Sequence, residues 1–172
     1  MRKLSMDELN RKSVEEFKES EKLPVIVVLE NIRSAYNVGS VFRTADAFLL
    51  EAIYITGYTC TPPHKEIKKT ALGAEDYLNW LRVQNLQTAV AVLKRKGYTI
   101  VALEQTADAQ NISIAKLDGK IALIVGNEVN GLDDQSLQNA EHKIFIPMKG
   151  RKESFNVAVA GALALHILGS KD

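Results

Sequence analysis

Five short runs of apolar, mostly β-branched residues constrain the fold of this chain more than any other feature of its sequence. The first, residues 25–29, is apolar at every position, which is typical of a strand that is buried on both faces. Similar runs recur at 52–56, 98–103, 121–125 and 143–146. Continuous apolar strands of this kind are characteristic of parallel sheets.

Helical patterns lie between and after these runs. They cover residues 38–49, 86–96, roughly 133–139, and 155–168. Strands that alternate with helices predict an α/β fold, in which a parallel sheet carries helices on both faces. At 172 residues the chain is expected to form a single domain.

Two stretches outside the predicted strands are less regular. Residues 1–23 are expected to form a short charged helix, for which Ser5 and Glu8 supply a capping box, and residues 24–172 to form the main domain. Pro62, Pro63 and Gly73 fall in the stretch 57–78, which is expected to be a surface loop or a short helix.

The ends of the strands predict a single site. In parallel sheets ligands bind beyond the carboxyl ends of the strands. Four of these exits are polar or turn-forming, at residues 30–31, 103–106, 126–128 and 147–149. Because they open on one edge of the sheet, we expect their side chains to meet there.

Arg43 is the first candidate for chemistry. The apolar positions of the helix 38–49 form one face, and Arg43 lies roughly 160° from its centre at 100° per residue. Its side chain leans back over Gly39, which would leave room for a ligand. On spacing alone an exposed arginine paired with Asp46 is the simpler interpretation.

Two turns supply further candidates. Residues 126–131 (Gly-Asn-Glu-Val-Asn-Gly) leave a buried strand, and turn chemistry alone explains all of them except Glu128.

Ser154 fits the N-cap of the last helix, which is as good an explanation as a ligand contact. Asn156 is then a poor helix former among apolar residues. The helix after it is rich in small residues and apolar on nearly every side, so it is packed on two sides, by the core alone or by the core and a second subunit.

Composition excludes several classes of protein. The net charge is +1, so a nucleic acid would have to be bound by local basic clusters. A single cysteine excludes an internal disulfide, and no Cys/His spacing resembles a metal site. The N-terminus lacks the apolar region of a signal peptide, and the longest apolar run, 157–168, is too short to cross a bilayer. We therefore expect a cytoplasmic protein.

Three segments in this order resemble the three motifs of the SpoU (TrmH-like) family of RNA ribose methyltransferases. They are residues 31–45, which contain Asn37 and Arg43, residues 122–132, which contain Gly126 and Glu128, and residues 144–160. The resemblance covers roughly residues 24–168. It departs from the family at one position, where Phe155 replaces the leucine of a Ser-Leu-Asn motif.

The resemblance implies a trefoil-knotted α/β fold, a homodimer, and transfer of a methyl group from S-adenosylmethionine to a ribose 2′-hydroxyl of tRNA or rRNA. DNA lacks that hydroxyl and is not expected as a partner. The implied catalytic residues are Arg43, Asn37, Glu128, Ser154 and Asn156, with Arg43 acting as a base or as an anion clamp. The implied cofactor-binding residues are Leu103, Val125, Gly126, Asn127, Ile146, Met148, Ser154 and Asn156.

Two basic clusters are the candidates for RNA binding, and each could also be a solvated surface. The first lies on the loop before the proposed site and the second on the irregular stretch; they are Lys149, Arg151 and Lys152, and Lys65, Lys68 and Lys69. Two rival functions remain: an RNA-binding protein of the same fold without catalysis, and another nucleotide-using α/β enzyme. The second is disfavoured because the chain has neither a Gly-x-Gly-x-x-Gly sequence nor a P-loop.

Overall fold

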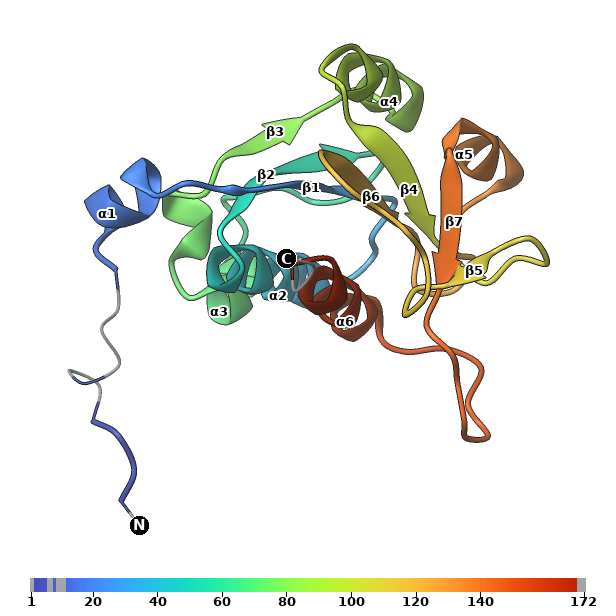
Figure 1. Ribbon diagram of the computed structural model, residues 1–172. Helices are drawn as coiled ribbons and strands as arrows, with labels where there is room; N and C mark the ends of the chain where they lie inside the picture. The colour runs from blue at the N-terminus through green and yellow to red at the C-terminus, as the bar shows by residue number, and fades with distance from the viewer. Residues whose placement is uncertain (1, 6–7, 9–11, 170–172) are drawn as a thin grey trace.

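The computed structural model describes residues 2–5, 8 and 12–169 (Figure 1). Its centre is a seven-stranded sheet in the order β3-β2-β1-β6-β4-β7-β5, in which every pairing is parallel. The strands are β1 (Leu23–Glu30), β2 (Leu50–Thr56), β3 (Trp80–Arg82), β4 (Thr99–Leu103), β5 (Gln110–Asn111), β6 (Ile121–Val125) and β7 (His142–Phe145). The predicted parallel α/β sheet is confirmed.

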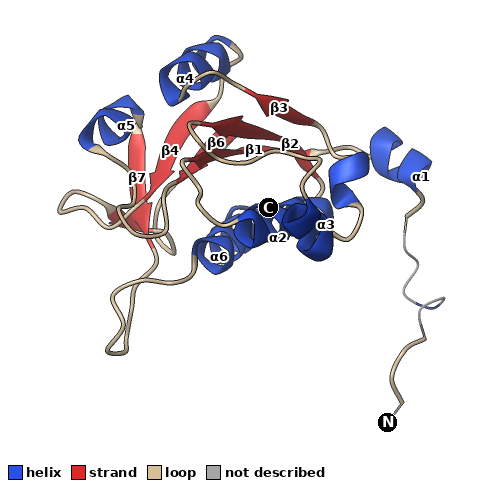
Figure 2. Ribbon diagram, turned by 180° about the vertical axis from the view of Figure 1, so that it is seen from behind, coloured by secondary structure: helices blue, strands red, loops and turns tan. Residues whose placement is uncertain are grey.

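Helices cover both faces of the sheet. Figures 1 and 2 show α2, α3 and α6 on one face and α4 and α5 on the other. The helices are α1 (Val14–Glu19), α2 (Ala35–Ala47), α3 (Lys65–Ala71), α4 (Leu86–Arg95), α5 (Asp134–Asn139) and α6 (Val157–Gly169), with a short 3-10 helix, η2 (Ala74–Asp76).

The central strands explain why their sequence is apolar without alternation. All five residues of β6 are buried, as are Val25 to Leu29 of β1. Side chains of one parity pack beneath α2 and α6, and those of the other parity pack beneath α4. The burial on both faces holds the polar turns at the carboxyl ends of β1, β4 and β6 in a fixed relation to one another.

The N-terminal helix is shorter than expected. The described helix is α1, which has a capping box of its own, formed by Ser13 and Glu16. Ser5 N donates to Glu8 Oε2 at 2.8 Å, which is one of the two hydrogen bonds of the predicted capping box. Part of the expected helix from Ser5 onward falls on residues 6–7 and 9–11, which lie outside the described residues. The helix ends at Glu19, because Ser20 is extended and leads into β1.

The irregular stretch 57–78 contains α3 and η2. Helix α3 packs against α2 at Gly39, where an added Cβ would lie 2.1 Å from Thr70 Oγ1 and 2.3 Å from the Ile67 carbonyl oxygen. The space beside Gly39 is therefore occupied by α3, and the expectation that it leaves room for a ligand is wrong. No helix in the described part of the chain is long and apolar enough to cross a membrane.

Candidate functional site

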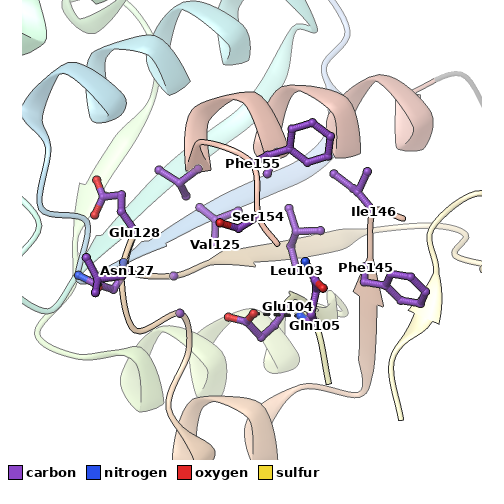
Figure 3. Close-up of a pocket in the computed structure, with 15 residues that line it drawn as sticks. Leu103, Glu104, Gln105, Val125, Asn127, Glu128, Phe145, Ile146, Ser154 and Phe155 are labelled. Atoms are coloured by element: carbon purple, nitrogen blue, oxygen red, sulfur yellow. Dashed lines mark hydrogen bonds between the residues drawn. The ribbon is translucent and has the colours of Figure 1, made fainter. Parts of the chain in front are cut away.

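A pocket opens at the carboxyl ends of β4, β6 and β7, where the sequence predicted a site. Figure 3 shows its lining, with residues from the ends of these strands and from the segment that leads into α6. Its lining residues are Leu103, Glu104, Gln105, Val125, Gly126, Asn127, Glu128, Val129, Gly131, Phe145, Ile146, Ser154, Phe155, Val157 and Ala160.

The turn that follows β6, residues 126–131, is held by Asn127. The buried Asn127 side chain accepts hydrogen bonds from Val129 N and Asn130 N, each 2.9 Å long. Its Nδ2 donates to Asn31 O at 2.9 Å and to the Tyr58 hydroxyl at 2.7 Å. Because both ends of this amide are engaged, Asn127 offers a ligand its backbone rather than its side chain.

Two glycines make this turn fit against its neighbours. A Cβ on Gly126 would lie 2.8 Å from the Gly131 carbonyl carbon and from two Leu132 side-chain atoms. Gly131 has a φ of 65°, and a Cβ there would lie 2.1 Å from Glu104 Oε2. Glu104 Oε2 accepts a hydrogen bond from Leu132 N at 2.9 Å. Glu104, which the sequence did not single out, therefore closes the turn from the β4 side.

The Glu128 carboxylate joins this turn to the start of α2. Oε2 accepts from Arg33 N at 2.8 Å, and Oε1 accepts from Ser34 N at 3.0 Å and from Asn37 Nδ2 at 2.8 Å. Burial alone raises the pKa of Glu128, but these hydrogen bonds outweigh it and hold the pKa below its ordinary value. An ionised carboxylate with both oxygens engaged holds the loops together and is a poor proton acceptor.

Asn156 links the third segment to the other two. Its Nδ2 donates to Asn37 Oδ1 at 3.0 Å, so Glu128, Asn37 and Asn156 form one chain of hydrogen bonds, here called the carboxylate–amide junction. Asn156 Oδ1 also accepts from Ala158 N at 2.9 Å. Asn156 thus caps α6, which begins at Val157. The predicted cap, Ser154, is two residues too early, and its side chain lines the pocket instead.

Arg43 lies apart from this junction. It is six residues beyond Asn37 on α2, about 9 Å along the helix axis, and it is exposed. Within the described part of the chain its guanidinium makes no hydrogen bond or ion pair, and Asp46 accepts from the Tyr77 hydroxyl at 2.9 Å rather than pairing with it. The structure does not place Arg43 in the pocket lining.

Six of the eight residues predicted to bind a cofactor line the pocket, and two do not. Met148 and Asn156 lie outside the lining. Glu104, Gln105, Phe145, Val157 and Ala160 line it without having been predicted. Glu104 and Gln105 belong to the predicted strand exit 103–106, so the sequence pointed to their position. The other three residues line the pocket because of the path that the chain takes between β7 and α6, which the sequence pattern does not show.

The basic loop 147–153 follows β7 and projects from the body of the molecule (Figure 1). Its Lys149, Arg151 and Lys152 are all exposed. Gln105 Nε2 donates to Glu153 O at 2.6 Å and ties the end of the loop to the pocket. The second predicted cluster lies on α3, where its three members are also exposed; they are Lys65, Lys68 and Lys69.

The sequence of this chain is similar to those of RNA methyltransferases. The 23S rRNA (guanosine-2′-O-)-methyltransferase RlmB of Vibrio parahaemolyticus is 29% identical over 158 residues, which cover 92% of this chain and 64% of that protein. The chain thus spans less than two thirds of that relative's length.

Two solved structures have the same fold. An AdoMet-bound rRNA methyltransferase from Sinorhizobium meliloti superimposes with a TM-score of 0.80 at 26% identity, covering 86% of this chain and 56% of that one. The A. aeolicus TrmH/SpoU tRNA modifying enzyme gives 0.81 at 26% identity, covering 91% and 79%. These likenesses are consistent with the trefoil-knotted fold that the sequence implied. The model of the SpoU rRNA Methylase family matches residues 24–166, and the chain belongs to that family.

Proposed function

We propose that this chain is an S-adenosylmethionine-dependent methyltransferase that methylates a ribose 2′-hydroxyl of structured RNA, either tRNA or rRNA. The observation that carries the proposal is the carboxylate–amide junction, in which three segments far apart in sequence meet beside an open pocket. A chain that only bound RNA would not require this junction beside a pocket. Residues 24–172 form the methyltransferase domain in this proposal.

The cofactor would occupy the pocket and supply an electrophilic methyl group. Leu103, Val125 and Ile146 give it apolar walls, while the backbone of Gly126 and Asn127 offers polar groups for its amino acid or adenine edges. Because Asn127 and Glu128 are held by hydrogen bonds within the protein, the turn that lines the pocket is preorganised. Ser154 lies on the wall that leads to the junction.

The acceptor hydroxyl is a weak nucleophile, so the residues around it must position it and favour its loss of a proton. Arg43 serves as an anion clamp, since a guanidinium stays protonated in proteins and is a poor base. It is exposed and makes no ion pair with the described residues, so its donors are available for a phosphate of the RNA. Asn37 and Asn156 hold the start of α2 and of α6 at the acceptor.

A homodimer is part of the proposal. Helix α6 and the residue before its cap expose a line of apolar side chains at four-residue spacing: Phe155 is 40% exposed, Val159 47% and Leu163 38%. Such a line on a helix that is already packed on the core is typical of an interface with a second subunit. Because Phe155 also lines the pocket, the same interface would complete the site.

RNA would be bound by the basic loop 147–153 and, further away, by the lysines of α3. A net charge of +1 leaves these clusters as the sources of phosphate affinity. The expected compartment is the cytoplasm.

The proposal is tested with labelled S-adenosylmethionine and total tRNA or rRNA from a strain that lacks the gene. Wild-type protein should transfer label to RNA but not to DNA of the same sequence. Arg43→Ala should lower transfer at least about tenfold, or about 1.4 kcal/mol of transition-state stabilisation, while cofactor affinity measured by calorimetry stays unchanged. Arg43→Lys should restore little of the activity. RNA binding without transfer on any RNA would instead identify a non-catalytic binding protein.

A further inference from the structure

Tyr58 is an exposed aromatic residue whose hydroxyl is bonded to a buried side chain. It follows β2 by two residues and so lies at the same edge of the sheet as the pocket. The residue is 61% exposed, yet its hydroxyl accepts a hydrogen bond at 2.7 Å from the buried Asn127 side chain. Tyrosines in folded proteins ordinarily bury the ring and leave the hydroxyl in contact with water.

The backbone at Tyr58 is also fixed by hydrogen bonds. Tyr58 N donates to Asn31 Oδ1 at 3.1 Å, and Gly57, at a φ of 61°, leaves no room for a Cβ beside that same oxygen. Arg82 Nη1 donates to Thr59 O at 2.6 Å and fixes the chain on the other side. A ring held at both ends loses little entropy when a planar ligand stacks on its face.

The neighbourhood has the chemistry of a single-stranded RNA surface. Tyr36, 43% exposed, lies in the first turn of α2, and Lys69 Nζ lies 6.0 Å from the centre of its ring. The connection from β2 into α3 contains Tyr58 and leads to the exposed lysines of α3. Aromatic faces for bases combined with cations for phosphates are what proteins use to bind unpaired nucleotides.

We propose that the Tyr58 ring is a stacking platform for an unpaired nucleobase of the RNA substrate. This inference rests on the proposed function and deepens it, because it requires the target to lie in a loop or a single strand. Through Asn127, which the Tyr58 hydroxyl contacts directly, the stacked base would sit against the turn that lines the pocket. A base held there orients the neighbouring ribose toward the site.

Three variants separate the ring from its hydroxyl and from general surface effects. Tyr58→Ala removes the ring, Tyr58→Phe keeps the ring and removes the bond to Asn127, and Leu81→Ala removes an exposed apolar side chain on the edge strand β3. The probes are a 12-nucleotide oligouridine and a 12-base-pair RNA duplex, measured by fluorescence anisotropy without cofactor. Calorimetry with S-adenosylmethionine and the melting temperature show whether each variant is folded.

Wild type should prefer the single strand to the duplex. Tyr58→Ala should weaken single-strand binding at least about fivefold and leave duplex binding unchanged, while Tyr58→Phe and Leu81→Ala stay within twofold of wild type. The inference is overturned if Tyr58→Ala binds oligouridine as wild type does, if it loses both probes equally, if Tyr58→Phe loses as much as Tyr58→Ala, or if wild type shows no preference. Absence of methyl transfer together with the expected Tyr58 differences would count against the proposed function alone.

Discussion

Two connections line the pocket from opposite sides, and they are built in opposite ways. The turn 126–131 is satisfied internally: Asn127 uses both ends of its amide, Gly131 packs on Glu104, and Glu128 is bonded to the start of α2. The segment 147–156 is exposed from the strand end almost to the helix, and Gln105 ties it to the pocket at Glu153.

This difference assigns separate tasks to the two connections. A turn whose polar groups are already paired presents a fixed backbone, which suits a small cofactor that is always the same. An exposed loop with three cations can adapt its side chains to phosphates, which suits a large RNA. We therefore expect variants of the turn to affect the cofactor and variants of the loop to affect RNA.

The largest effect is expected in the turn, from Gly126→Val. The new side chain would collide with Gly131 and Leu132, so the turn cannot keep its shape and cofactor affinity should fall more than about 100-fold. The matched control is Gly150→Val in the loop, where an added Cβ meets nothing within 4 Å. Calorimetry with S-adenosylmethionine compares the two, and equal cofactor affinities would remove the contrast between the connections.

The loop should carry the salt dependence of RNA binding. The plot of log affinity against log salt has a negative slope. Replacing Lys149, Arg151 and Lys152 together by glutamine should make that slope shallower by roughly 0.7 to 0.9 for each phosphate that the loop no longer neutralises. Cofactor affinity should not change. Filter binding to total tRNA across a salt series measures this, with a second triple variant of the α3 lysines for comparison. Identical slopes for wild type and the loop variant would remove the loop from the RNA surface.

Asn156 lies where the loop ends and the junction begins, and two substitutions separate its bond to Asn37 from its role as the cap of α6. Asn156→Ala removes the cap of α6 and should destabilise the fold by about 1 kcal/mol. Asn156→Asp keeps an acceptor for Ala158 N but cannot donate to Asn37. Both variants should lower methyl transfer, and only the alanine variant should lower the melting temperature. Full activity in the aspartate variant would reduce Asn156 to a helix cap.

The smallest effect is a pH dependence of the turn. Folding lowers the pKa of Glu128, so its contribution to stability is fully present above the ordinary glutamate pKa of about 4.3 and is lost as the pH falls through the lower folded pKa. The stability of wild type against urea should fall more steeply than that of Glu128→Gln as the pH drops below about 4.3. Parallel curves would mean that the carboxylate charge does not hold the turn to α2.

The regular part of this molecule followed from its sequence because apolar runs specify buried strands. The five expected strands and four helices after the first strand are present. The strand exits at 103–106 and 126–128 meet at the pocket, and Asn31 is bonded to Asn127, whereas the exit at 147–149 lies outside the pocket lining. The expectations that proved wrong depended on contacts between residues that are distant in sequence. The space at Gly39 is filled by α3, about thirty residues further along the chain, and the cap of α6 is Asn156 because Asn37 and the first turn of α6 share its amide. Strand β3 is three residues and β5 two, too short for a pattern to show.

The central claim is that a cofactor lies on the rigid turn while RNA is bound by the exposed loop. A crystal structure of the wild-type protein with S-adenosylhomocysteine tests it most directly. We expect the ligand between Leu103, Gly126 and Ile146, with the turn 126–131 unchanged and its sulfur facing Asn37 and Asn156. A ligand bound elsewhere, or a turn that rearranges to receive it, would contradict the account.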